Sequence, residues 1–389
     1  MTDLSQRLKN LTPEQKKLLE MRLKKKESDA SAPAAELSQA GPLAKPPAKK
    51  RTMDFSIFFF SDDGTGTGSQ KYRLLMEAAK LADKNGFSAV WTPERHFETF
   101  GGLYPNPSVL GAALAMITER LQIRAGSVVL PLHSPVRVAE EWGLVDNLSN
   151  GRVGISFATG WHDRDYVIRP QNYEDRREIM FRDIVTVRRL WAGETVTIPG
   201  VKDRPVEVRT LPRPVQPSLP YWVTASSPGT WQRGGQVGAN ILSMMGHSME
   251  EVAAYIRSYR QARAENGHDP RTGIVSLMIH TFLGEDLAKT KEKVREPMCR
   301  YLKNYLSQFK KLADSQAYED EDRLLEFAFE RYFNQSSLLG TPEKCEIMVD
   351  LLCDAGVNDL PCLIDFGAPY DDVMTSLELL SELRKKYSH

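Results

Sequence analysis

Short apolar runs alternate with longer amphipathic stretches along most of the chain. The apolar runs predict strands at 54–60, 89–91, 121–130, 153–158, 220–224, 240–244, 274–283 and 360–366. The stretches with helical periodicity predict helices at 70–85, 135–148, 173–191, 249–266, 342–355 and 371–386. Strands that alternate with helices indicate an α/β protein with a parallel sheet, and about eight such units indicate a closed (β/α)8 TIM barrel. A doubly wound open sheet is the alternative.

Two parts of the chain depart from this alternation. Residues 285–339 are too many for a loop and have a helical pattern, so we expect a helical insertion before the last repeat. Residues 1–52 begin with a helix start at Thr12-Pro-Glu-Gln and continue into a stretch rich in Ala, Pro, Ser and Lys. That composition buries little apolar surface, which predicts a short helix and a flexible, disordered linker ahead of a barrel at 53–389.

Composition and charge narrow the classes of function. The 51 basic and 51 acidic residues balance, which argues against a nucleic-acid-binding protein. The sequence contains neither an apolar run of membrane-spanning length nor a signal-peptide core, so we expect a cytoplasmic protein. The four cysteines lack Cys-x-x-Cys spacing and are expected to be reduced thiols. Neither a metal-ligand set nor a Gly-x-Ser-x-Gly elbow is visible, so we predict no metal site and no serine hydrolase.

A polar cluster follows directly after the apolar strand at 89–91. Gly86, just before it, suits the left-handed conformation that ends a helix. Glu94, Arg95 and His96 come immediately after the strand. In a (β/α)8 barrel the loops after the strands meet at one pocket, so these side chains are the first candidates for catalysis. Imidazole titrates near neutral pH, which makes His96 the leading acid–base candidate.

A serine-rich turn follows the strand at 220–224 and opens a helix. Ser226, Ser227 and Thr230 supply hydroxyl groups. Gly229 lets the backbone approach a ligand closely. Free amide groups and the helix dipole favour phosphate at such a helix start, although a capping turn without a ligand is the alternative. The glycine-rich segment 64–68 lacks the third glycine of a dinucleotide fingerprint, which favours a mononucleotide such as FMN.

Four ordered motifs resemble those of a known family: Glu-Arg-His-Phe at 94–97, Pro-Val-Arg-Val-Ala-Glu-Glu-Trp at 135–142, Asp-Asn-Leu-Ser-Asn-Gly-Arg at 146–152 and Thr-Gly-Trp-His at 159–162. Over about residues 53–389 the chain is similar to the luciferase-like flavin monooxygenases. It looks most like the subgroup associated with polyketide and nonribosomal peptide biosynthesis, which the segments 241–246 and 277–282 also fit.

This resemblance implies where a flavin would bind. The FMN phosphate would lie at the serine-rich turn, with Arg176 at the position of the family's phosphate-facing arginine. Thr159 would hydrogen-bond the flavin, and Trp161 and His162 would form walls of its pocket.

The resemblance also implies a special backbone feature. Gly126 and Ser127 would be joined by a cis peptide under the flavin ring, and both are counted among the cofactor-binding residues.

Bacterial luciferase has two successive histidines after the second strand, and its essential one matches Arg95 here. We therefore expect no light-emitting aldehyde oxidation. Arg95 and His162 remain catalytic candidates beside His96; Arg95 would hold an anionic group, and Glu94 would orient Arg95 or His96.

By resemblance, the chain is expected to be a homodimer that uses reduced FMN, delivered by a separate flavin reductase, and O2. The expected substrate is a natural-product intermediate tethered to an acyl or peptidyl carrier protein, which the N-terminal region would contact. Two alternatives stay open. One is a deazaflavin-dependent hydride-transfer oxidoreductase on the same fold, and the other is a non-catalytic flavin-binding assembly partner.

Overall fold

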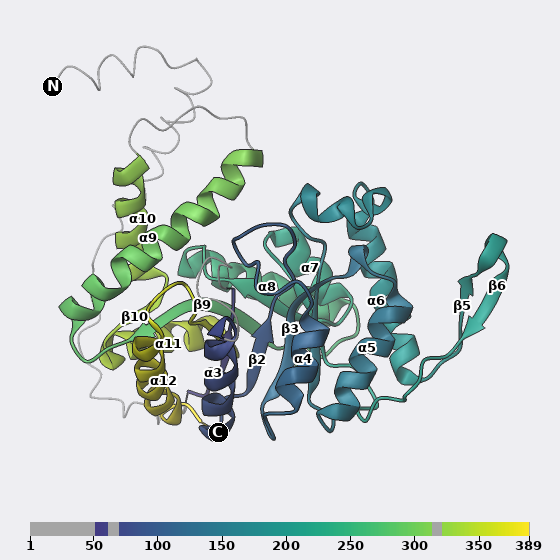
Figure 1. Cartoon of the computed structure of the whole chain (residues 1–389), viewed down its shortest axis with the longest axis horizontal. Helices are drawn as coiled ribbons and strands as arrows, with labels where there is room; N and C mark the ends of the chain where they lie inside the picture. The colour runs from purple at the N-terminus through teal and green to yellow at the C-terminus, as the bar shows by residue number, and fades with distance from the viewer. Residues whose placement is uncertain (1–50, 61–69, 313–320, 389) are drawn as a thin grey trace, which may run out of the picture. The chain divides into compact units, whose positions relative to one another are not determined.

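A computed structural model of the chain describes residues 51–60, 70–312 and 321–388. The predicted N-terminal helix, nearly all of the predicted linker and the glycine-rich loop at 64–68 lie outside these described residues. The strands and helices of the described part form a barrel wrapped by helices (Figure 1).

Eight parallel strands close the barrel. In chain order they are β1 (Asp54–Phe58), β2 (Ala89–Thr92), β3 (Gln122–Val129), β4 (Val153–Ala158), β7 (Tyr221–Thr224), β8 (Asn240–Met244), β9 (Val275–Leu283) and β11 (Asp359–Leu363). Each pairs with its neighbours in this order, and β11 pairs with β1 to complete the ring. The predicted (β/α)8 barrel is therefore confirmed, and the open-sheet alternative is wrong.

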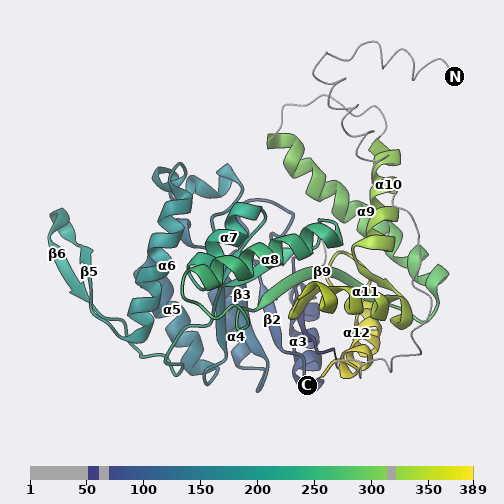
Figure 2. The same ribbon diagram turned by 180° about the vertical axis from the view of Figure 1, so that it is seen from behind.

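Helices surround the barrel on its outer side, as the two opposite views show (Figures 1 and 2). They are α3 (Arg73–Lys84), α4 (Pro107–Ala115), α5 (Pro135–Leu148), α6 (Arg176–Ala192), α7 (Pro228–Gln236), α8 (Met249–Glu265), α11 (Pro342–Ala355) and α12 (Tyr370–Lys385). Helix α3 shows how the predicted helical periodicity matches the burial of its side chains. Leu75, Ala78 and Ala82 are buried against the barrel, and the chain leaves the helix through Gly86 at φ 74°, the left-handed conformation that the sequence predicts.

The predicted helical insertion lies between the seventh and eighth barrel strands. It contains α9 (Leu287–Leu312), α10 (Glu321–Gln335) and a short strand, β10 (Leu338–Gly340), which pairs with β9. Helices α9 and α10 contact each other beside the C-terminal end of β9. The insertion therefore adds a further layer to that side of the barrel.

Besides β10 and the short 3-10 helices, two elements have no counterpart among the sequence predictions. Helix α4 is apolar on nearly all sides, so its sequence has no helical periodicity. Its start is fixed by Asn106, whose side chain accepts hydrogen bonds from the backbone amides of Ser108 and Val109. The second element is an antiparallel hairpin of β5 (Val196–Pro199) and β6 (Pro205–Val208), which reaches away from the barrel in both views. Its strands are short and largely exposed, so they lack the apolar run of a barrel strand.

The barrel interior contains a polar group within its aromatic packing. The guanidinium of Arg124 lies over the rings of Trp91 and Trp222, 4.9 and 4.6 Å from their centroids. It donates to Asp359 Oδ2 at 2.9 Å, and both side chains are buried. Because a buried guanidinium requires a partner, this pair holds β3 and β11 in one register across the barrel.

Candidate functional site

The strands β2, β3, β4 and β7 end at the same mouth of the barrel. The parallel register pairs Val129 with Ala158, which are the last residues of β3 and β4, whereas β2 ends at Thr92 beside Ala125, four residues before β3 ends. The loops after these strands carry most of the predicted site residues. In a parallel barrel this end is where loops from separate strands combine into one site.

Glu94 is the centre of a hydrogen-bond cluster just after β2. Its side chain is 0% exposed, and its Oε1 lies 2.8 Å from Nε2 of His96. Its Oε2 accepts from the backbone amide of Val129 at 2.7 Å. Of the two partners expected for Glu94, the structure thus pairs it with His96 rather than with Arg95.

A second histidine, His133, binds the same carboxylate oxygen. Its Nε2 lies 2.6 Å from Glu94 Oε1, and its side chain is 33% exposed. Burial alone would raise the pKa of the Glu94 carboxyl, yet the hydrogen bonds from His133 and His96 hold that pKa below its ordinary value. Burial likewise opposes the charged form of His133, but Glu94 raises the pKa of that imidazole.

Sequence reasoning missed His133. The available signal was its position just after the third strand, in the loop that precedes the Pro135 motif. A loop after a barrel strand is a place where functional residues are found.

Arg95 points away from Glu94 and is buried. Its guanidinium pairs with Asp165 Oδ2 at 3.1 Å and donates to the carbonyl of Phe100 at 3.3 Å. Burial lowers the pKa of Arg95 despite the nearby carboxylate, and burial raises the pKa of Asp165 despite the nearby guanidinium. An ion pair of this kind fixes the loop after β2 against the loop after β4.

The segment 159–162 lies next to this pair. Trp161 packs its ring 3.8 Å from the ring of His162 and lies 5.3 Å from the Arg95 guanidinium. His162 is buried, whereas Trp161 is 40% exposed. The structure therefore places the three predicted residues Arg95, Trp161 and His162 together at the barrel mouth.

Hydroxyl groups line the neighbouring strand ends. Thr224 Oγ1 hydrogen-bonds Ser127 Oγ and lies 2.7 Å from Ser156 Oγ, which links β7, β3 and β4. The peptide between Gly126 and Ser127 is cis, as the resemblance predicts. Thr92, at the end of β2, has a buried hydroxyl without a hydrogen-bond partner among the described residues.

The predicted phosphate turn starts α7. Ser227 is the extended N-cap residue, and its side chain makes no capping bond; its Oγ instead lies 3.0 Å from Thr230 Oγ1. Ser226 is exposed, and the space beside the Cα of Gly229 is open. An exposed serine and open space beside a glycine at a helix start fit the size and charge of a phosphate group, although the Ser227 and Thr230 hydroxyls bond each other here.

Arg176 begins α6 and is tied to the loop after β4. Its guanidinium donates to the backbone carbonyl of Tyr173 at 2.6 Å and lies over the aromatic ring of the same residue. The ring of Tyr173 packs against Tyr166, whose hydroxyl donates to the carbonyl of Thr159 at 2.5 Å. Burial raises the pKa of Tyr166 to about 12, so this hydroxyl remains a donor. Arg176 and Thr159 thus belong to one packed unit.

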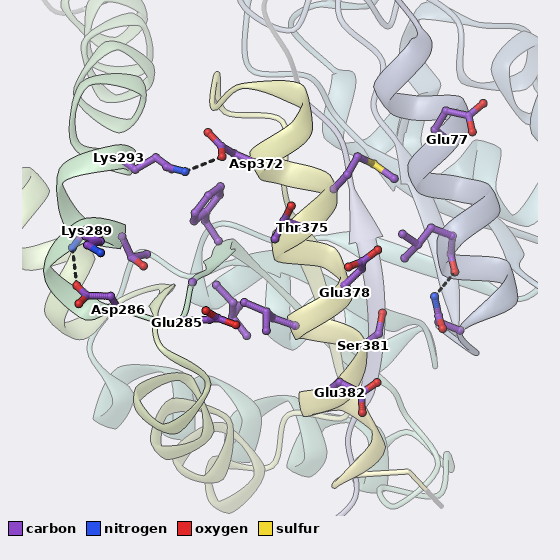
Figure 3. A pocket seen from close by; sticks show the side chains of 18 of the residues that line it. Glu77, Glu285, Asp286, Lys289, Lys293, Asp372, Thr375, Glu378, Ser381 and Glu382 are labelled. Atoms are coloured by element: carbon purple, nitrogen blue, oxygen red, sulfur yellow. Dashed lines mark hydrogen bonds and ion pairs between the residues drawn. The ribbon is translucent and has the colours of Figure 1, made fainter.

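A large cavity lies away from this site. It has a volume of about 1080 Å³ and lies outside the barrel, between α3, α12 and the start of α9 (Figure 3). Its walls carry charges of both signs, including the ion pair between Lys293 and Asp372 at 2.6 Å. None of the predicted site residues lines it, so its size does not make it the active site.

The described residues contain no group of three His, Cys, Asp or Glu side chains placed to hold a metal ion. Among their helices, none combines the length and the apolar character needed to cross a membrane.

Comparison with known proteins gives the family. A model described as luciferase-like monooxygenase matches residues 53–359, most of the chain. The chain belongs to the luciferase-like monooxygenase family. As a member of this family it is a flavin-dependent monooxygenase. This agrees with the resemblance that the four ordered motifs indicate.

Two curated relatives show the range of the family. The chain is 24% identical to the alkanal monooxygenase alpha chain of Photorhabdus luminescens over 328 residues, which are 79% of this chain and 89% of that one. It is 27% identical over 238 residues to the oxygenase component of a flavin-dependent trigonelline monooxygenase from Acinetobacter baylyi, covering 60% of this chain and 66% of that one.

Solved structures share the fold. Monooxygenase RslO1 from Streptomyces bottropensis superposes with a TM-score of 0.74 at 23% identity, covering 85% of this chain and 98% of that one. The oxygenating constituent of 3,6-diketocamphane monooxygenase from Pseudomonas putida, in complex with FMN, gives 0.71 at 19% identity, covering 86% and 98%. An F420-dependent secondary alcohol dehydrogenase gives 0.67 at 17% identity, covering 87% and 100%.

Proposed function

We propose that this monooxygenase binds reduced FMN at the barrel mouth and uses it with O2 to oxygenate an organic substrate. The observation that carries the proposal is the Glu94 carboxylate with two imidazoles on one oxygen, at the same barrel end as the open start of α7. An acid–base group at the same end of the barrel as a turn suited to phosphate is a combination that fits a flavin oxygenase. When bound, FMN would supply the redox chemistry with O2.

Separate groups of residues would bind the phosphate and the ring of FMN. The turn Ser226–Thr230 would hold the FMN phosphate, with Arg176 as a further positive charge near it. Thr159 and the Gly126–Ser127 peptide would contact the flavin ring.

Catalysis would fall to the groups around the loops after β2 and β4. His96 would accept or return a proton during oxygen transfer. His162 would form a wall that excludes water. Arg95 would position the loop after β2 through its pair with Asp165, which compensates the charge of its guanidinium.

The source of reduced flavin is proposed to be a separate reductase. The trigonelline relative is named an oxygenase component, and the diketocamphane structure is named an oxygenating constituent, which supports a division between two proteins. A reductase that supplies reduced FMN to the chain in the cytoplasm would account for this arrangement.

The proposed substrate is a natural-product intermediate bound to an acyl or peptidyl carrier protein. This rests on the motif resemblance to the biosynthetic subgroup, and the N-terminal region proposed to contact the carrier lies outside the described residues. The test is mass spectrometry of carrier-bound acyl and aminoacyl groups after incubation with reduced FMN and 18O2. A gain of one labelled oxygen atom supports the proposal, whereas consumption of O2 with no labelled product from any carrier-bound group would contradict the substrate class.

A homodimer is also proposed. Val109 on α4, Met116 just after α4, and Leu144 and Leu148 on α5 are large exposed apolar side chains, and the two helices contact each other. Such a patch marks an interaction surface more often than a free one. Light scattering should show a dimer for the parent, and Met116→Glu with Leu144→Glu should shift it to the monomer. A monomeric parent would end this proposal.

The deazaflavin alternative has one observation in its favour, since an F420-dependent dehydrogenase shares the fold. Reduced F420 and reduced FMN can be compared directly by binding and by O2 consumption. Tight binding of FMN with O2 consumption supports the monooxygenase. Hydride transfer from F420 without O2 would favour the alternative, and flavin binding with neither activity would favour an assembly partner.

A further inference from the structure

The contact between Glu94, His96 and His133 has an unusual charge balance. Both imidazoles approach the same oxygen, Oε1, at 2.8 and 2.6 Å, while the other oxygen accepts from the amide of Val129. With the carboxylate ionised, each ring must present an N–H from its Nε2. One negative charge therefore faces two groups that can each become a cation.

Two cations so close together repel each other strongly in a partly buried site. One imidazolium is stabilised by Glu94, while a second would find that charge already compensated. The two rings therefore compete, and the protonation of one opposes the protonation of the other. The surrounding charges decide which ring is protonated first.

The surroundings favour His133. It is the more exposed ring, at 33% against 12% for His96, and so retains more of its hydration when charged. Glu141 on α5 favours its charged form, although Glu141 is also bound by Ser108 and Arg137, and Arg169 opposes it.

His96 faces a second carboxylate, Asp165 on the loop after β4, but that carboxylate already pairs with the buried Arg95. The net charge facing His96 from that side is therefore close to zero. Glu94 remains the carboxylate for which the two rings compete.

We propose that His133 is a positioning residue that carries the positive charge paired with Glu94, and thereby keeps His96 neutral with its Nε2–H on Glu94 and its Nδ1 ready to accept a proton. The role of His96 in turnover rests on the proposed function. The charge distribution itself is a property of the protein without cofactor.

The proposal also gives a route for the proton. A proton accepted at Nδ1 of His96 creates a second cation on the same carboxylate. His133 then releases a proton from its own Nδ1 to water, which restores one cation for one carboxylate. Both rings keep their Nε2–H bonds to Glu94 throughout, so the geometry of the site does not change.

Nuclear magnetic resonance of 15N-labelled imidazole rings tests this without cofactor. The chain has seven histidines, and His96→Gln and His133→Gln assign the two signals. In the parent, His133 should titrate at a higher pH than His96, and neutral His96 should be the Nε2–H tautomer. In His133→Gln, which keeps an N–H donor but no charge, the midpoint of His96 should rise by about one pH unit or more.

Two further variants sharpen the result. His133→Lys keeps a cation beside Glu94 and should leave the midpoint of His96 low, and it serves if His133→Gln does not fold. His247→Gln is the matched control, because His247 faces Glu251 on α8 at 3.9 Å and should not affect His96. An unmoved midpoint in His133→Gln, or a parent in which His96 is protonated first, would overturn the proposal.

Turnover provides a separate readout. If the proposed function holds, the ratio of product to H2O2 should fall at low pH, and this acid limb of the pH profile should move to higher pH in His133→Gln and not in His133→Lys. If reduced FMN and O2 give no turnover, the proposed function fails while the histidine titrations still decide the charge proposal. A normal titration shift with an unmoved acid limb would contradict the role of His96 as the proton acceptor.

Discussion

Removing the carboxylate of Asp359 should strongly destabilise the barrel. Its Oδ2 accepts from Arg124 at 2.9 Å and from Ser276 Oγ at 2.7 Å, and its Oδ1 accepts from Ser56 Oγ at 2.8 Å. In Asp359→Ala the guanidinium of Arg124 stays buried between two tryptophans without its ion-pair partner. Two buried hydroxyls lose an acceptor as well.

The magnitude follows from these contacts. Removing one partner of a buried ion pair costs about 3–5 kcal/mol. Each hydroxyl that loses its acceptor adds about 1 kcal/mol. Asp54 also lies close enough to favour the charged form of Arg124 and offsets part of the loss. We therefore expect the free energy of unfolding to fall by about 5 kcal/mol, which lowers the melting temperature of a barrel of this size by roughly 7 °C.

Thermal unfolding followed by circular dichroism and urea midpoints measure this effect. Asp354→Ala is the matched control, since it removes an exposed partner of Arg51 and should cost under about 1 kcal/mol. The double variant Arg124→Met with Asp359→Leu should be more stable than Asp359→Ala, because it leaves no unpaired charge. A loss in Asp359→Ala no larger than that in Asp354→Ala would refute the reasoning.

Four further predictions concern the site and the tail. Ser226→Ala with Thr230→Ala should weaken reduced-FMN binding at least tenfold by fluorescence titration, because charge-assisted phosphate bonds of about 1.5–3 kcal/mol are lost; unchanged affinity would move the phosphate elsewhere. His96→Ala should lower product formation by about 10²–10⁴-fold and raise H2O2 release with FMN affinity unchanged; lost FMN binding would instead make His96 a cofactor ligand. Folding raises the pKa of His133, so its ion pair stabilises the fold below about pH 6.5 and this stabilisation is lost as pH rises through the folded pKa. The free energies of unfolding of the parent and His133→Gln should therefore differ more at pH 5.5 than at pH 8.5. Deleting residues 1–50 should change the melting temperature by only a few degrees; a large loss would show that the segment packs on the barrel.

Much of the fold could be predicted because local signals agree with the tertiary structure. Helices at 135–148 and 342–355 and strands at 153–158 and 240–244 have the predicted bounds. Each is bounded by Gly, Pro or a polar turn, and its apolar residues have the matching period. Helix α4 and the β5–β6 hairpin lack this agreement, since α4 has no polar face and the hairpin buries little.

The partners in the candidate site were harder to predict because they are distant in sequence. Glu94 and His96 follow a strand and are visible together, whereas His133 binds Glu94 across 39 positions and Asp165 binds Arg95 across 70. The barrel closes these distances through its parallel register, which no local pattern reveals. The roles assigned to Arg176, Ser226, Thr159 and the other site residues remain predictions that the experiments above address.

One tryptophan of this chain gives the candidate site its own optical signal. Five of the six are at most 1% exposed in the barrel and under its helices, while Trp161 is 40% exposed beside His162. A collisional quencher such as acrylamide should therefore reach Trp161 first, and Trp161→Phe should remove most of the quenchable emission from the folded protein. Occupation of the barrel mouth, by whatever molecule, can then be followed as protection of a single indole in solution, with no label attached and no turnover required.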